Sequence, residues 1–124
     1  MSIEFKPLER LDLLDDLIYQ DEDIFSWSNE KAHEFQLLFI SDAFKHHYTN
    51  SEKYKAYCDR LGVGPSDIKT VGDLGKIPLL PSGLFKETRV LSCPPTDVVK
   101  ICESSGTRGT ISKVYRDGDT LERF

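Results

Sequence analysis

The first half of the chain is patterned for helices, because its apolar residues recur at intervals of three and four. Pro7 opens the first such segment. Its apolar side comprises Leu8, Leu11, Leu14, Leu17 and Ile18. This spacing predicts a short amphipathic helix over residues 8–18. A longer helix is predicted over residues 29–47, with Ser26 and Ser28 as candidate N-caps.

A third helix is predicted after residue 50. The four residues from Thr49 to Glu52 have the pattern of a capping box, with the threonine at the cap. The apolar stripe that follows comprises Tyr54, Tyr57, Cys58 and Leu61. Gly62 is expected to end this helix, and Cys58 is expected to be a buried thiol rather than a nucleophile. Residues 1–62 are therefore predicted to be mainly helical.

Glycine and proline interrupt the chain after residue 62, so only short elements fit there. One-turn helices are predicted to begin near Thr70 and Ser82, and a short strand is predicted at residues 90–92. Residues 63–97 are therefore interpreted as a Pro/Gly-rich connection.

The C-terminal segment, residues 98–124, is patterned for a β-hairpin. Residues 98–103 and 111–117 are rich in β-branched side chains, which favours strands. A turn is predicted at residues 117–120, and a helix is expected to begin at Leu121. The expected fold class is α+β, with N-terminal helices, short elements and a hairpin in a single domain of 124 residues.

Charge is distributed unevenly along the chain. The net charge is −5; residues 1–50 carry eleven acids and four bases, whereas residues 51–124 carry ten acids and twelve bases. A net acidic chain argues against nucleic-acid binding, in which a basic surface supplies most of the affinity. The mildly basic second half is the better place to expect an anionic ligand.

Several other classes of protein and site are not supported by the sequence. No run approaches the roughly 20 apolar residues of a membrane span, and the start lacks the features of a signal peptide. Three cysteines without tight spacing do not make a disulfide framework, so a cytoplasmic location is expected. The neighbouring His46 and His47 would diverge by about 100° on a helix, so no metal site is predicted.

The loop between the two predicted strands has the composition of a phosphate cradle. It comprises Ser104, Ser105, Gly106, Thr107, Arg108, Gly109 and Thr110, and Lys113 follows in the second strand. Glycines let successive amides converge on an anion, the hydroxyls add donors, and Arg108 and Lys113 add positive charge. The alternative is a hairpin loop whose Ser, Thr and Gly residues only satisfy the turn.

The loop from Ser104 to Gly109 resembles the phosphate-binding signature of adenylate-forming ligases, Ser-Ser/Thr-Gly-Thr-Thr-Gly with a nearby Lys. Three further stretches follow the same order as in one branch of these enzymes: residues 23–26, 76–86 and 116–121. The chain thus resembles the N-terminal part of the LuxE family, the acyl-protein synthetases of the bacterial luciferase fatty-acid pathway, and more distantly the phenylacetate–CoA ligases. Arg108 departs from the signature by replacing the second Thr. Lys113 also lies one residue farther from the last glycine, preceded by Ser112 instead of Pro.

The resemblance implies an enzyme that activates a carboxylic acid, such as a fatty acid, with ATP and Mg²⁺. Residues 104–110 and Lys113 would hold the β- and γ-phosphates while the carboxylate attacks the α-phosphorus. The acyl group would then pass to a protein or thiol, with an acyl reductase or carrier protein as partner. In this family the acyl-carrying cysteine and the adenine pocket belong to the C-terminal part. The chain is therefore expected to be a fragment of a larger adenylate-forming fold, inactive alone, and no catalytic residue is assigned.

The competing hypothesis is a non-catalytic helical interaction module. Its N-terminal helices would bind a reductase or carrier protein, and the hairpin loop would be purely structural. The acidic first half of the chain and the missing catalytic part favour this alternative.

Overall fold

The computed structural model describes residues 15–17, 23–106 and 109–122. Residues 15–17 are helical, and the rest of the helix predicted over residues 8–18 lies outside the described residues. Helices and a two-stranded antiparallel sheet make the described chain α+β, as the sequence predicts.

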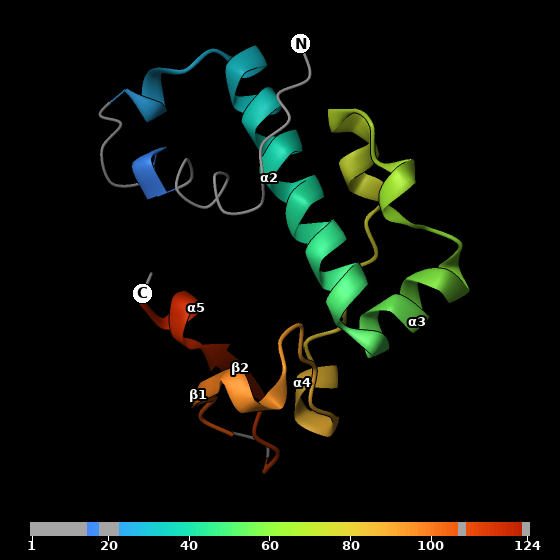
Figure 1. The fold of residues 1–124 in the computed structure, drawn as a ribbon, viewed down its shortest axis with the longest axis vertical. Coiled ribbons are helices and arrows are strands. Elements are labelled where there is room, and N and C mark those ends of the chain that lie inside the picture. Colours follow the sequence, from blue (N-terminus) through green and yellow to red (C-terminus); the bar gives the residue numbers. More distant parts are fainter. Residues whose placement is uncertain (1–14, 18–22, 107–108, 123–124) are drawn as a thin grey trace.

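Helix α2 (Asn29–Asn50) is the central element of the fold, and it follows the short 3-10 helix η1 (Ile24–Ser26) (Figure 1). Ser28 is its N-cap, and the Ser28 hydroxyl accepts a hydrogen bond from the Lys31 amide at 3.2 Å. The predicted cap and start are therefore confirmed. The helix ends at Asn50 rather than at residue 47, because no glycine or proline interrupts it there.

Helix α3 (Glu52–Leu61) begins almost where α2 ends. Its N-cap is Ser51, whose hydroxyl accepts a hydrogen bond from the Tyr54 amide at 3.4 Å. The prediction that Thr49 caps this helix is therefore wrong, because Thr49 still belongs to α2. Gly62 ends α3 in the left-handed conformation, with φ at 73°, as predicted.

The buried core lies where α2, α3 and the segment after α3 meet. Its buried members are Phe44, Tyr54, Cys58 and Ile68. The Phe44 and Tyr54 rings meet edge to face with centroids 6.0 Å apart, and the Tyr54 hydroxyl donates to the Pro78 carbonyl at 2.7 Å. Burial raises the pKa of Tyr54 above its usual range, so this hydroxyl stays protonated and able to donate. The prediction that Cys58 is a buried thiol is confirmed.

Short helical turns fill much of the connection between α3 and the hairpin. These are η2 (Pro65–Asp67), η3 (Val71–Lys76), α4 (Leu84–Glu87) and η4 (Pro95–Asp97). The one-turn helices predicted near Thr70 and Ser82 correspond to η3 and α4. Residues 90–92 form no strand, so that prediction is wrong. The described sheet contains only the two strands of the hairpin, and Ser92 forms a hydrogen bond with His47 of α2 instead.

The hairpin consists of β1 (Val98–Glu103) and β2 (Lys113–Asp117), which pair antiparallel. Strand β1 has the predicted bounds, whereas β2 begins two residues later than predicted. Helix α5 (Gly118–Glu122) begins three residues before the predicted Leu121, because the Asp117 carboxylate accepts a hydrogen bond from the Thr120 amide at 2.8 Å. Figure 1 shows the hairpin, α4 and α5 gathered near the C-terminal end of α2.

Candidate functional site

The backbone of the loop between β1 and β2 has a glycine with positive φ at two positions. Gly106 and Gly109 have φ values of 64° and 82°, in the left-handed region that favours glycine. The Gly109 amide donates to the Gly106 carbonyl at 2.9 Å and closes a tight turn. A Cβ on Gly106 would lie 2.8 Å from the Ile111 side chain. The positive φ values at both positions, and the contact with Ile111 at Gly106, thus favour glycine.

Ser104 extends the hairpin ladder by one step beyond β1. Its amide donates to the Ser112 carbonyl at 3.0 Å, and its hydroxyl oxygen accepts from the Ser112 amide at 2.9 Å. The Ser104 amide is thus engaged within the hairpin. Its hydroxyl hydrogen can still be donated to another acceptor.

The remaining predicted ligands occupy the loop and its base. Ser105, Gly109, Thr110 and Lys113 are exposed. Lys113 is the first residue of β2 and lies directly opposite Glu103 in the register. Thr107 and Arg108 lie outside the described residues. The structure thus places most of the predicted site in one solvent-facing loop, and its convergence on an anion stays a prediction.

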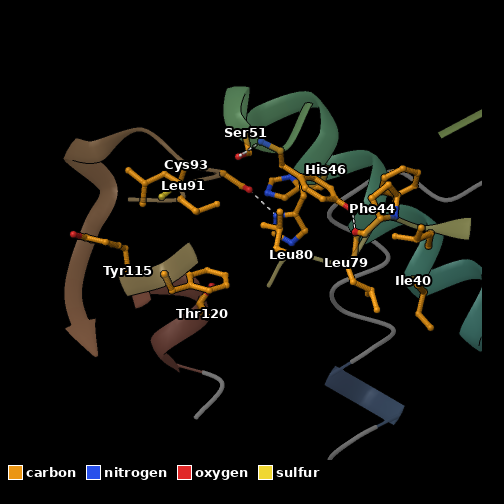
Figure 2. Close-up of a pocket in the computed structure, with 18 of the residues that line it drawn as sticks. Ile40, Phe44, His46, Ser51, Leu79, Leu80, Leu91, Cys93, Tyr115 and Thr120 are labelled. Atoms are coloured by element: carbon orange, nitrogen blue, oxygen red, sulfur yellow. Dashed lines mark hydrogen bonds between the residues drawn. The ribbon is translucent and has the colours of Figure 1, made fainter. Parts of the chain in front are cut away.

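A cavity of about 560 Å³ lies beside the hairpin (Figure 2). Its apolar lining includes Ile40, Phe44, Leu79, Leu80, Phe85 and Leu91. These side chains come from α2, α4 and the connections on either side of α4. Residues distant in sequence build the cavity together, so no local pattern reveals it.

The polar part of the cavity is formed by the end of α2 and the segment before the hairpin. His46 and His47 line it together with Ser92, and His47 Nδ1 lies 2.6 Å from Ser92 Oγ. Burial, followed by the neighbouring His46, lowers the pKa of His47, so this imidazole is neutral near pH 7. A neutral imidazole has one donor and one acceptor nitrogen, so His47 offers a hydrogen-bonding edge without a fixed charge.

Asp117 and Cys93 also line the cavity, and both have perturbed pKa values. Hydrogen bonds from the Thr120 hydroxyl and amide hold the pKa of Asp117 below its usual range. Burial raises the pKa of the Cys93 thiol, and the charges of Asp117 and Asp97 raise it further. Cys93 is therefore protonated near neutral pH and poorly suited to act as a nucleophile.

Sequence reasoning missed this cavity. It assigned His46 and His47 no role and placed Ser92 in a strand. The hydrogen bond between His47 and Ser92 joins positions 45 residues apart, and only tertiary structure brings them together. Within the described ranges, no cluster of three or more His, Cys, Asp or Glu side chains could hold a metal ion.

Known proteins resembling this chain are acyl-activating ligases. The family model described as "Acyl-protein synthetase, LuxE" matches residues 2–124. The chain belongs to this family. The "Long-chain-fatty-acid--luciferin-component ligase" of Vibrio harveyi is 34% identical over 90% of the chain, and that of Photorhabdus luminescens is 31% identical over 84%. The "Phenylacetate-coenzyme A ligase" of Aromatoleum evansii is 29% identical over 80% of the chain.

The share of each relative that is covered differs widely. The chain spans 28% of the Vibrio harveyi ligase, 85% of the Photorhabdus luminescens ligase and 24% of the Aromatoleum evansii ligase. The resemblance of the chain to the LuxE family and, more distantly, to phenylacetate–CoA ligases is confirmed. No helix of the described ranges is long and apolar enough to cross a membrane.

Proposed function

We propose that the chain supplies the phosphate-binding loop of an ATP-dependent acyl-activating enzyme. The observation that carries the proposal is the loop between β1 and β2, which turns on two positive-φ glycines in a chain of the LuxE family. The proposed ATP-binding residues are Ser104, Ser105, Gly106, Thr107, Arg108, Gly109, Thr110 and Lys113. They would hold the β- and γ-phosphates.

The described side chains of the loop suit a triphosphate. Ser105 and Thr110 offer hydroxyl donors at exposed positions, and Lys113 places a positive charge at the base of the loop. At Gly109 nothing lies within 4 Å of the place that a Cβ would take, so an anion could approach the backbone closely there. Mg²⁺ would be held chiefly by the phosphates, as this ion usually is in nucleotide sites, and would balance their charge.

The proposed reaction is carboxylate activation. The carboxylate would attack the α-phosphorus of ATP and release pyrophosphate, while the loop positions the leaving phosphates and stabilises their charge. The names of the relatives favour a long-chain fatty acid as substrate and a protein component as acceptor. The acyl group would then pass to a protein or thiol, with an acyl reductase or carrier protein as partner. The cysteines of the described residues are unpaired, in keeping with the reducing cytoplasm that we propose as the location.

Equilibrium binding of Mg·ATP to the chain tests the loop. Lys113→Ala is expected to weaken binding about tenfold or more, because it removes a charge-assisted hydrogen bond to phosphate. Lys100→Ala is the matched control, since Lys100 is also an exposed lysine of the hairpin but lies in the middle of β1. It should leave the affinity within about twofold. Absent binding, or equal loss in both variants, would overturn the proposal and favour a purely structural loop in a helical interaction module.

A further inference from the structure

The cavity beside the hairpin is lined by none of the proposed phosphate ligands, and most of its wall is apolar. Its volume of about 560 Å³ falls within the usual range for pockets that bind small organic molecules. Ile40 and Leu79, on its lining, are 44% and 82% exposed, so the apolar surface continues outward to solvent. Figure 2 shows Ile40, Phe44 and Leu79 together on one side of His46, with Leu91 and Cys93 on the other. Such a site favours a ligand with a long apolar part.

Several polar groups of the lining already have structural roles. Ser51 caps α3, the Tyr54 hydroxyl donates to the Pro78 carbonyl, and Asp117 caps α5. The Thr120 hydroxyl is bonded to Asp117. The imidazoles of His46 and His47, the hydroxyls of Ser92 and Tyr115, and the Cys93 thiol are therefore left to meet the polar end of a ligand.

The charge of the lining limits which polar group the end of a bound ligand can carry. Asp117 contributes a negative charge to the wall, which disfavours phosphate or another multiply charged group. His47 offers hydrogen bonding without a fixed positive charge. A small polar group with no more than one charge, which accepts hydrogen bonds from an imidazole N–H and from the Ser92 hydroxyl, satisfies these conditions, and a carboxyl group is one such group.

Building on the proposed function, we propose that this cavity binds the alkyl chain of a long-chain fatty acid, with the carboxyl group beside His47 and Ser92. The apolar wall would take the methylenes, each of which adds about fourfold to affinity when buried. Tyr115 and Asp117 of β2 also line the cavity, so the bound acid would lie against the strand that leaves the loop. The substrate and the triphosphate would thus share the hairpin.

Displacement of cis-parinaric acid by saturated fatty acids tests the cavity without any nucleotide. The full chain is expected to bind one molecule per protein. Affinity should rise about fifteenfold for every two carbons until the cavity is filled, measured below the critical micelle concentrations. Absent saturable binding, or affinity independent of chain length, would overturn the proposal.

A cavity-filling substitution and its matched control locate the site. Ala43 is an exposed residue of α2 that lines the cavity, whereas Ala56 is an exposed residue of α3 outside the lining. Ala43→Trp is expected to weaken laurate binding at least tenfold, and Ala56→Trp to leave it within about twofold. Equal behaviour of the two variants would show that the acid binds elsewhere on the protein. Far-UV circular dichroism checks that both variants are folded.

A second pair of variants tests the polar end. His47→Leu should weaken binding of laurate about fivefold and that of 1-dodecanol by about twofold or less, because a hydrogen bond to the charged carboxylate is stronger than one to a neutral hydroxyl. His33→Leu, on the exposed surface of α2 outside the lining, should change neither. Equal weakening of both ligands by His47→Leu would contradict the placement of the carboxyl group. Fatty-acid binding without Mg·ATP binding would uphold the cavity and reject the loop, and Mg·ATP binding alone would do the reverse.

Discussion

The helical core and the hairpin differ sharply in how they are stabilised. The core is built on buried side chains of α2 and α3, with Phe44 only 3% and Cys58 0% exposed. In the hairpin, Val99, Ile101 and Val114 are 60%, 48% and 40% exposed. A two-stranded hairpin is at best marginally stable alone, so this one depends on the rest of the fold. Most of the stability is therefore expected to come from the helical core, whereas the proposed phosphate chemistry lies in the hairpin. Substitutions in each region can test the two contributions separately.

The largest expected effect is that of Phe44→Ala in the core. Phe44 packs against Tyr54 and against Tyr48, whose ring centroid lies 6.2 Å away. Removing its ring should lower the free energy of unfolding by about 3–5 kcal/mol, because it removes buried apolar surface and leaves a cavity. Chemical denaturation followed by circular dichroism measures this change.

Ile101→Ala is the matching truncation in the hairpin, and its loss of stability is compared with that of Phe44→Ala. Ile101 is about half exposed on β1, opposite Tyr115, so truncation should cost about 1 kcal/mol or less. If Ile101→Ala destabilised the protein as much as Phe44→Ala does, the contrast between the two regions would be wrong.

An effect smaller than that of Phe44→Ala is expected from Gly106→Ala in the hairpin loop. A left-handed backbone costs an L residue about 1–2 kcal/mol, and the new Cβ would also press on Ile111. Gly109→Ala is the matched control, because Gly109 has a positive φ but nothing lies within 4 Å of the place that its Cβ would take. Urea unfolding should show a larger loss for Gly106→Ala than for Gly109→Ala. Equal losses would mean that Ile111 moves aside freely.

Local sequence patterns predicted much of the fold. The bounds of β1, the cap at Ser28 and the stop at Gly62 follow from residue type and spacing, and all three are confirmed. The prediction of a cap at Thr49 failed because Thr49, Asn50 and Ser51 follow one another and each is a residue type that suits a cap position. Only packing of α3 on α2 selects Ser51, which is 2% exposed.

The candidate sites differ in the same way. The loop is continuous in sequence, so its glycines and hydroxyl residues could be recognised before the structure was known. The cavity joins His47 to Ser92 and α2 to β2, and no spacing rule connects positions so far apart. Residues 90–92 show why: their β-branched and apolar character suggested a strand, but the described sheet gives them no strand to pair with.

The smallest expected effect is the pH dependence of stability from two carboxylates that accept hydrogen bonds from amides at the start of a short helix. They are Asp73 in η3 and Asp117 before α5. The ammonium of Lys76 at 2.7 Å, with the amides of Lys69 and Thr70, holds the pKa of Asp73 well below its usual range. A lowered pKa in the folded state stabilises the protein above the unfolded value of about 4, and this contribution is lost as the pH falls below it. Asp73→Asn keeps an acceptor but removes the charge, so its Tm should lie below wild type at pH 7 and converge with wild type under strongly acidic conditions.

Asp117→Asn should show the same trend more weakly, because Thr120 supplies hydrogen bonds but no positive charge. A Tm difference that stayed constant between pH 7 and pH 2 would contradict the electrostatic account of both helix starts.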